Sequence, residues 1–268
     1  MKAIWKGSLL IGKLEIPVKL YAAVEAHSLG FRLVHAKCHT PLNYQRICPK
    51  CKKKIAWNDV DKAMELADGS FFIITPEKLE TLKPESLDEI TIKEFVEPSL
   101  IAPIYYNAHY YLAPTKVTEK AYFLLVETMQ ELNKTAIATF VMKEKDHVCA
   151  ISAYQHALLL STLNYSYEIR PIERVEELSV KVAARVSKKE EELAEKLVKK
   201  MSSKKFDISA FHDTFAEKLR EQIKRSAAGK KLLKVRAQKA VKEHGVSLLE
   251  SLEESVAEKK PARAKSRR

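Results

Sequence analysis

Glycine is scarce in this sequence, with only six among 268 residues, whereas average usage would be about 7% of residues. The Gly-rich loops that cradle phosphate groups in nucleotide-using enzymes therefore have little material, and no nucleotide cofactor is expected. Long apolar runs are also absent: no stretch of about 18 apolar residues occurs, which argues against a membrane-spanning helix. The four cysteines do not indicate a disulfide framework in a cytosolic chain, and they favour metal binding or inert thiols.

The N-terminus lacks the apolar stretch and small-residue cleavage site of a signal peptide. We therefore expect a cytoplasmic protein without a membrane partner. Apolar residues make up 46% of the chain, which is enough for a hydrophobic core in one or two domains.

Basic side chains are in excess, with 47 Lys and Arg against 35 Asp and Glu, a formal net charge of +12. Residues 1–187 hold 24 basic and 22 acidic side chains, whereas residues 188–268 hold 23 and 13. This asymmetry predicts a nearly neutral folded body followed by a basic segment, which favours nucleic acid or another anionic surface as partner. The alternative is a solvated helical tail that only keeps the protein soluble.

The body of the chain is predicted to be rich in strands. Asp68 and Gly69 mark a hairpin turn. A mainly β body with one sizeable helix is typical of a β-barrel with an appended helical layer. Short apolar or alternating runs, separated by turn residues, occur at 9–21, 31–36, 70–75, 89–96, 105–112, 136–143, 147–154 and 158–163.

Two helices are expected within this body. Thr75 and Pro76 offer an N-cap and a first helical residue for a short helix over residues 77–82. Thr118 can cap a longer helix that reaches residue 132, just before a stop signal at Asn133.

After residue 187 the apolar spacing becomes helical. Ser187 and Glu190 form a capping box, and the apolar residues that follow on one face are Leu193, Leu197 and Met201. A second amphipathic helix, ending at Gly229, is predicted from the four-residue spacing of Phe211, Phe215, Leu219 and Ile223. A third helical stretch is predicted to residue 244, and a fourth begins at Ser247. Residues 259–268 are basic, lack apolar periodicity and are predicted to be disordered.

A possible metal site is the most distinctive local pattern. Cys48 and Cys51 are separated by two residues, and Cys38 lies about ten residues upstream, which suits one structural zinc ion per chain. His35 or His39 would be the fourth ligand. The alternative is a set of ordinary reduced thiols near a surface hairpin. Cys149 lies in a strand pattern and is expected to be a small buried apolar residue.

No catalytic motif is complete. Lys37 stands where a zinc deaminase needs its catalytic Glu, so the general acid/base is missing. Gly7, Gly12 and Lys13 come close to a phosphate-binding loop, but Leu14 replaces the hydroxyl that would hold magnesium. The large apolar residues between the two glycines favour a strand. We therefore expect a protein that is not an enzyme.

Two surface patterns leave alternatives open. The basic tip at residues 50–54, with Arg46 and Tyr44 nearby, is either a phosphate-contacting element or a solvated loop. The tyrosines of residues 105–111 could stack on bases, but their alternation within a hairpin favours packing.

Taken in order along the chain, these motifs resemble the bacterial Ku family. The resemblance covers residues 1–229. It rests on Trp5-Lys6-Gly7-Ser8, Ile16-Pro17-Val18-Lys19-Leu20-Tyr21, His35-x-x-Cys38, Cys48-Pro49-x-Cys51, Ile73-Ile74-Thr75-Pro76-Glu77-x-Leu79, Ile104-Tyr105-Tyr106 with Tyr110-Tyr111-Leu112-x-Pro114, Lys120-Ala121-Tyr122-x-Leu124-Leu125 and Glu168-Ile169-Arg170.

The resemblance implies a homodimer in which two β-barrel cores with bridging arms form a ring. Such a ring threads onto double-stranded DNA ends and recruits the ATP-dependent DNA ligase D for non-homologous end joining, in association with the nucleoid. Residues 1–187 would be the core, 188–229 the helical ligase-recruiting segment and 230–268 a basic extension. The partner-binding candidates in the helical segment are Leu193, Leu197, Phe211, Phe215 and Leu219.

A ring that recognises ends must contact the phosphate backbone rather than the bases, so it needs Lys and Arg without a base-reading helix. The candidates on its inner surface are Lys6, Lys13, Lys19, Arg32, Arg46, Lys52, Lys53 and Lys143. The tail would add Lys259, Lys260, Arg263, Lys265, Arg267 and Arg268. The alternative function is a zinc-containing nucleic-acid-binding protein that coats or packs DNA without end specificity.

Overall fold

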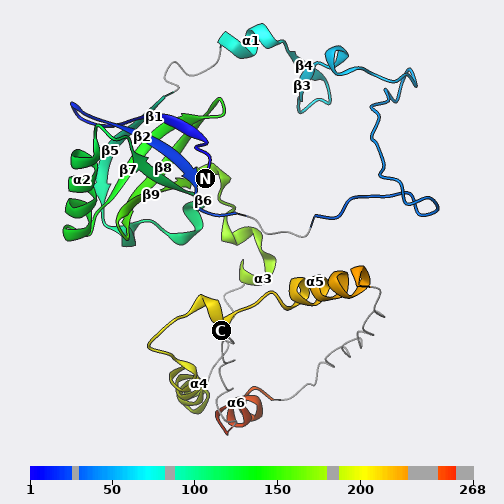
Figure 1. Cartoon of the computed structure of the whole chain (residues 1–268). Helices are drawn as coiled ribbons and strands as arrows, with labels where there is room; N and C mark the ends of the chain where they lie inside the picture. The colour runs from blue at the N-terminus through cyan, green and yellow to red at the C-terminus, as the bar shows by residue number, and fades with distance from the viewer. Residues whose placement is uncertain (26–29, 82–87, 180–186, 229–246, 258–268) are drawn as a thin grey trace. The chain divides into compact units, whose positions relative to one another are not determined.

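A computed structural model describes residues 1–25, 30–81, 88–179, 187–228 and 247–257. The chain divides into two compact units, Met1–Arg174 and Val175–Arg268 (Figure 1). The sequence predicts that the folded body ends at residue 187. Residues 180–186, just before this predicted boundary, lie outside the described part of the chain.

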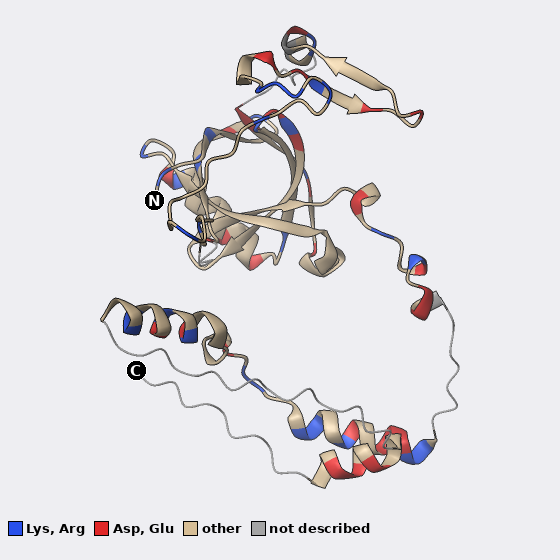
Figure 2. Cartoon of the chain, turned by 90° about the vertical axis from the view of Figure 1, so that its right-hand side faces the viewer, with Lys and Arg blue, Asp and Glu red and all other residues tan. Residues whose placement is uncertain are grey.

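Seven strands of the first unit close into a barrel in the order β1-β2-β6-β9-β8-β7-β5, and Figure 2 looks into its interior. All neighbouring pairs are antiparallel except β1 and β5, whose parallel pairing closes the barrel. The strands are β1 (Trp5–Ile11), β2 (Leu14–Ala22), β5 (Glu89–Val96), β6 (Tyr106–Pro114), β7 (Thr135–Met142), β8 (Lys145–Tyr154) and β9 (Ala157–Leu163). The predicted run at residues 9–21 is two strands, because Gly12 has a φ of 58° in the two-residue turn between Ile11 and Leu14.

The barrel core is built by the inward residues of the alternating strands. Its fully buried side chains include Leu9, Ile16, Val18, Leu20, Ile90, Leu112, Ile151, Leu158 and Leu160. Cys149 also faces this core, and burial raises the pKa of its thiol. It is therefore a small buried apolar residue, as predicted.

Helix α2 (Glu119–Glu131) lies against the barrel (Figure 1). Its buried Tyr122 joins two strands, because the hydroxyl donates to the carbonyl of Leu112 on β6 (2.5 Å) and accepts from the N–H of Leu158 on β9 (2.8 Å). Thr118 is the N-cap residue, but its hydroxyl makes no capping bond. It donates instead to the carbonyl of Pro17 (3.3 Å), which ties the start of the helix to β2.

Gly7 lies where β1 meets β5. The N–H of Ser8 donates to the carbonyl of Asp88 (2.9 Å), and a β-carbon added to Gly7 would lie 2.0 Å from that oxygen. Gly7→Ala is therefore expected to lower the free energy of unfolding by about 3 kcal/mol, measured by denaturant unfolding. Gly30→Ala is the matched control, since an added β-carbon there meets nothing within 4 Å. Equal losses in both variants would contradict this role of Gly7.

Residues 30–81, called the arm below, contain little regular structure. They include β3 (Lys62–Glu65) paired antiparallel with β4 (Phe71–Ile74), the short helix α1 (Pro76–Thr81) and a 3-10 turn at Trp57–Asp59. The hairpin at Asp68 and Gly69 and the helix after Thr75 are confirmed. The predicted strand at 31–36 is wrong: only Val34 pairs, with Pro41, because the chain turns back over residues 35–40.

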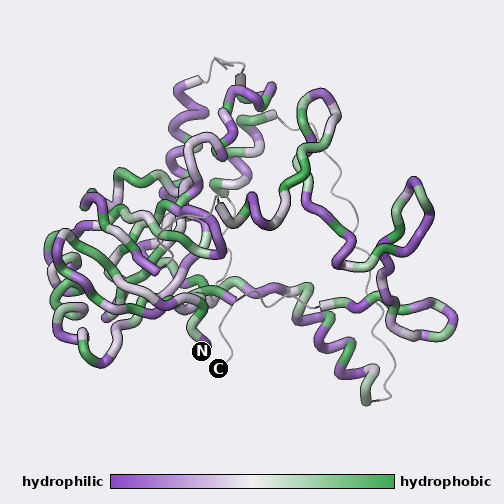
Figure 3. Tube along the Cα trace, turned by 90° about the horizontal axis from the view of Figure 1, so that it is seen from above, coloured by the Kyte–Doolittle hydropathy of each residue, from purple (hydrophilic) through white to green (hydrophobic). Residues whose placement is uncertain are grey.

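The arm exposes many apolar side chains and buries none among the residues whose burial is described. Hydrophobic stretches occur along its open loops in Figure 3. Such a concentration of exposed apolar groups is unusual for the surface of a monomer, and exposed patches of this kind are typical of interaction sites. The exposed large side chains are Phe31, Leu33, Val34, Leu42, Tyr44, Ile47, Trp57, Val60, Met64, Leu66, Phe71, Phe72 and Ile73.

The second unit is helical. Its helices are α3 (Glu176–Ser179), α4 (Lys188–Met201), α5 (Thr214–Ala227) and α6 (Leu248–Ala257). The predicted capping box of α4 is confirmed, since Ser187 Oγ accepts from the N–H of Glu190 (3.3 Å). The prediction that Phe211 belongs to the second helix is wrong: Asp213 caps α5, so Phe211 lies in the preceding loop. The predicted third helical stretch and the tail lie outside the described residues.

The remaining short 3-10 turns are Pro98–Leu100, Pro103–Tyr105, Ser166–Glu168, Ile172–Arg174 and Ile208–Ala210. None of the described helices is both long enough and apolar enough to cross a membrane.

Candidate nucleic-acid interface and candidate metal ligands

Two of the predicted DNA-contacting lysines lie directly opposite each other on the barrel. Lys6 on β1 pairs with Lys19 on β2, whereas the neighbouring pair, Trp5 and Leu20, faces the core. Like charges directly opposite each other in a sheet are destabilising. Among the described residues, no acidic side chain forms an ion pair with either lysine. A phosphate group between the two ammonium groups would relieve their repulsion.

The same outer face continues onto β6 as an aromatic surface. Tyr21, two residues after Lys19, pairs with Tyr111, whose ring stacks on Tyr154 with 6.5 Å between centroids. Tyr110 has the opposite orientation and packs against the core. The packing role favoured for these tyrosines therefore holds for Tyr110 in the core and for Tyr111 on Tyr154. Tyr21 and Tyr111 lie beside the Lys6–Lys19 pair on the outer face.

The other predicted basic residues are spread over the first unit, on barrel turns and along the arm (Figure 2). Lys13 lies in the turn between β1 and β2, and Lys143 lies in the turn between β7 and β8. In the barrel, β5 lies between β7 and β1. In the arm, the Arg46 guanidinium lies 3.9 Å from the centroid of the Trp57 ring, a cation–π contact. Arg32, Lys52 and Lys53 are exposed, and the tail residues lie outside the described part.

Residues 35–40 form a tight turn, called the first knuckle below. The N–H of His39 donates to the carbonyl of His35 (2.8 Å), and the N–H of His35 donates to that of Thr40 (2.9 Å). His35 Nδ1 lies 3.0 Å from Cys38 Sγ. Hydrogen bonds from Thr40 and then His35 lower the pKa of Cys38 to about 7, which favours the thiolate that metals bind.

Residues 48–53, the second knuckle, repeat this backbone. The N–H of Lys52 donates to the carbonyl of Cys48 (2.9 Å), and the N–H of Cys48 donates to that of Lys53 (3.0 Å). Hydrogen bonds from the backbone and then the side chain of Cys51 lower the pKa of Cys48. Lys52 has a φ of 56°, close to the 55° of His39 in the first knuckle.

The two knuckles therefore share the same pattern of backbone hydrogen bonds. By position in this pattern, His35 corresponds to Cys48, Cys38 corresponds to Cys51, and His39 corresponds to Lys52. Among the described residues, no three His, Cys, Asp or Glu side chains gather to hold one metal ion. The structure thus brings the predicted ligands together as two pairs, and their union around one ion stays a prediction.

Some of the predicted partner-binding residues are half-buried and the others are exposed. Leu193 and Leu197 on α4 and Leu219 on α5 are half-buried. Phe211 and Phe215 are each 70% exposed. Of these two phenylalanines, Phe211 makes a ring contact with Phe206, with 6.1 Å between the ring centroids.

Comparison with known proteins agrees with this barrel. The family model described as the Ku70/Ku80 beta-barrel domain matches residues 10–200. The chain belongs to the Ku family. The predicted fold, a mainly β Ku-like barrel with an arm and C-terminal helices, is thereby confirmed.

Several relatives are similar over nearly their whole length, and each is a non-homologous end joining protein Ku. The one from Heliobacterium modesticaldum is 32% identical and is covered to 95%, with 99% of this chain matched. That from Archaeoglobus fulgidus is 32% identical, with 96% of this chain and 98% of the relative covered. Ku 1 of Geotalea uraniireducens is 33% identical, with 98% and 99% covered.

Proposed function

We propose that the protein binds the ends of double-stranded DNA in non-homologous end joining, as a ring-shaped homodimer rather than as an enzyme. The names of the relatives of this Ku chain support end joining as the process. The observation that carries the proposal is the Lys6–Lys19 pair on the outside of the barrel, on strands rather than on a helix that could read a groove. A sequence-independent ligand such as the phosphate backbone fits this arrangement.

The exposed arm supports a second copy of the chain as partner. β4 is apolar on both faces: Phe71 and Ile73 are 66% and 53% exposed, and Phe72, on the other face, is 50% exposed. Strands that are apolar on both faces are typical of sheets covered on both sides, and a lone two-stranded hairpin is marginal in water. In the proposed ring each arm is covered by the partner and the two copies enclose DNA.

The helical unit would recruit ATP-dependent DNA ligase D. Phe211 and Phe215 offer exposed aromatic side chains, a residue type that is enriched at protein interfaces. In the cell, a DNA-bound protein of this kind would be cytoplasmic and associated with the nucleoid.

The proposed ring is tested by DNA topology. We expect tight binding to a linear duplex and at least tenfold weaker binding to a relaxed closed circle of the same sequence, because a ring loads only over an end. Cutting the same circle once should restore the affinity, which controls for sequence and length. Equal affinity for both forms would contradict the ring and favour the alternative, a protein that coats or packs DNA through general charge contacts.

The two knuckles would together hold one structural zinc ion through His35, Cys38, Cys48 and Cys51. The donor set fits, since three thiolates and one imidazole are an ordinary tetrahedral zinc set. Zinc would stabilise residues 35–53 of the arm, which bury no side chain of their own.

Metal analysis of purified variants tests this site. We expect about one zinc ion per chain in the parent, less than half an ion in His35→Ala, and no loss in His39→Ala, because His39 corresponds to Lys52 of the second knuckle. Fewer than about half an ion per chain in the parent would refute a structural site. Equal losses in both histidine variants would refute the assignment of His35.

A further inference from the structure

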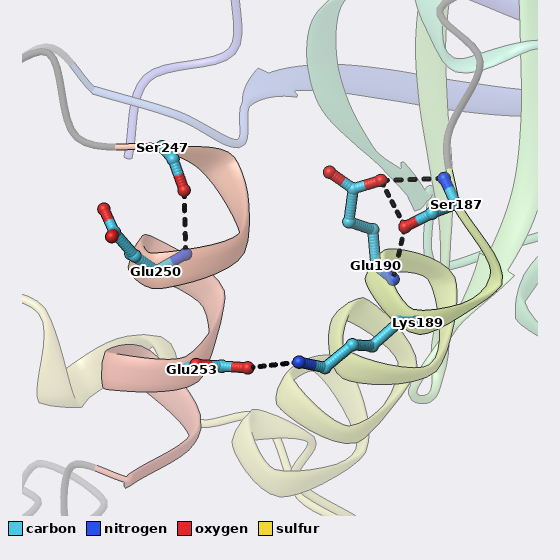
Figure 4. A network of polar contacts seen from close by, with 6 residues as sticks. All are labelled: Ser187, Lys189, Glu190, Ser247, Glu250 and Glu253. Carbon is cyan, nitrogen blue, oxygen red and sulfur yellow. Dashed lines mark hydrogen bonds and ion pairs between the residues drawn. The ribbon is translucent and has the colours of Figure 1, made fainter.

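The C-terminal helix α6 lies side by side with α4 (Figures 1 and 4). The half-buried residues of α4 form one stripe, which includes Leu193, Ala194 and Leu197. Those of α6 form a matching stripe of Leu249, Leu252 and Val256. Both stripes follow the three- and four-residue spacing of a helix face that is packed on one side. Apolar contact between the two helices is therefore specific to one face of each.

Polar contacts fix the pairing at two points. Lys189 Nζ lies 2.8 Å from Glu253 Oε1 across the interface (Figure 4). Lys200 Nζ donates to the carbonyl oxygen of Val256 (2.7 Å). That oxygen belongs to the last turn of α6, where carbonyls lack a helical partner and a positive charge is favoured by the helix dipole. Lysines of α4 thus recognise both a carboxylate and the C-terminal end of α6.

Each helix also has its own start signal. Ser187 Oγ accepts from the N–H of Glu190, and Ser247 Oγ accepts from the N–H of Glu250 (3.3 Å) (Figure 4). In Figure 4 the two capped ends lie toward the same side of the pair. A separate cap makes α6 a defined helix rather than an extension of the segment before it.

The charge of α6 does not suit DNA. The helix carries Glu250, Glu253 and Glu254 and no basic residue. The segments on either side of it, residues 229–246 and 258–268, each contain six Lys or Arg and one Glu. An acidic helix between two basic segments is repelled by phosphates, so the extension gains nothing for DNA contact from α6. The lysines of α4 give its glutamates a different use.

We propose that the face of α4 formed by Lys189, Leu193, Leu197 and Lys200 is a docking site for an acidic amphipathic helix, and that α6 occupies it in the free protein. The proposal rests on the proposed function in one respect: Leu193 and Leu197 are also among the residues that the sequence predicts to bind the ligase. The ligase would then present a helix of the same chemistry and displace α6. α6 is accordingly a built-in competitor that lowers the affinity of α4 for its external partner.

A tethered helix competes with an external helix at an effective concentration that its linker sets. Residues 202–247 join α4 to α6. Short flexible linkers give effective concentrations of the order of millimolar and longer ones give lower values, so a contact of moderate strength is needed to keep most of the chains closed. If about one chain in ten is open, the apparent dissociation constant of an external helix is raised about tenfold. Opening the pair should recover that factor.

The first experiment uses a labelled synthetic peptide of residues 247–257 as the probe and the full-length protein as the receptor. Leu252→Asp places a charge in the half-buried stripe of α6 and should tighten peptide binding about tenfold, because α4 is vacated. Leu248→Asp is the matched control, on the same helix but 59% exposed, and should bind the peptide like the parent. Leu197→Asp, on α4, should abolish binding whatever the state of α6.

Hydrogen exchange supplies a readout that does not depend on the peptide. The amides of α4 should exchange faster in Leu252→Asp than in the parent or in Leu248→Asp. Lys189→Glu should weaken the pairing, and Glu253→Lys in the same chain should restore protection. Unchanged peptide affinity and unchanged exchange in Leu252→Asp would overturn the occupation of α4 by α6.

The same variants separate this inference from ligase recruitment. Purified ligase D should bind Leu252→Asp about tenfold more tightly than the parent. If the ligase binds all variants equally while the peptide responds as expected, the shared use of α4 by ligase and α6 is refuted. If the ligase binds none of them, recruitment itself fails, and the peptide and exchange results still decide whether α4 takes an acidic helix.

Discussion

Replacing both Lys6 and Lys19 by glutamate should lower the affinity for a short linear duplex about 100-fold at physiological salt. Each lysine contacts a phosphate in the proposed ring, and each glutamate adds repulsion at the same place. The loss should depend on salt: every phosphate contact removed flattens the dependence of log K on log salt by about 0.9, or about 1.8 per chain. Fluorescence anisotropy over a series of salt concentrations measures both quantities.

The matched control is Lys116→Glu with Lys120→Glu. It makes the same change in net charge on the same unit, at exposed residues just before and at the start of α2. Its affinity should fall by only a few-fold, through the weaker overall field of the protein. An equal loss in both double variants would mean that only net charge matters and that the DNA lies elsewhere.

A stability measurement separates binding from folding at this site. The single variant Lys19→Glu places opposite charges across β1 and β2, so its free energy of unfolding should rise by about 0.5 kcal/mol while DNA affinity falls. A rise in the free energy of unfolding together with a fall in DNA affinity would indicate that the two lysines serve ligand binding rather than stability. A loss of both would instead indicate that the variant damages the barrel.

The Lys6–Lys19 pair could be predicted from the sequence, because Gly12 and Lys13 form a two-residue turn. Such a turn sets the register of the two strands that it joins. The closure of the barrel could not be predicted in this way, because β1 pairs with β5, which lies far away in the sequence. Local pattern carries no information on which distant edges will pair.

The errors have local physical causes. Phe31, Leu33 and Val34 favour a strand by residue type, but the reversal at His39 needs a left-handed backbone that spacing does not reveal. Phe211 matches the four-residue spacing of the apolar residues in α5. It lies outside the helix because Asp213 is the N-cap and the helix begins at Thr214. The covering of α4 by α6 is a tertiary contact, and a capping box predicts where a helix begins but not what it touches.

Placing aspartate at both Phe71 and Ile73 should convert the proposed homodimer into a monomer. The two side chains share one face of the β3–β4 hairpin and are both more than half exposed, so their burial in the partner interface would contribute several kcal/mol per arm. The dimer dissociation constant should rise at least 100-fold, measured by analytical ultracentrifugation, and end binding should be lost with it. The thermal stability of the barrel should not change, because neither residue belongs to its core.

The control for this variant is Leu100→Asp with Val117→Asp, which removes two exposed apolar residues of the same unit outside the arm, 73% and 94% exposed. It should remain a dimer. The opposite face of the hairpin gives a second test: Met64→Asp with Phe72→Asp should also dissociate the dimer, because a strand that is apolar on both faces is expected to be covered on both. If the arm instead folds onto its own barrel, the Phe71 and Ile73 variant would lower the melting temperature while the mass in solution stays that of the parent. That outcome would refute the arm as the element that joins two copies.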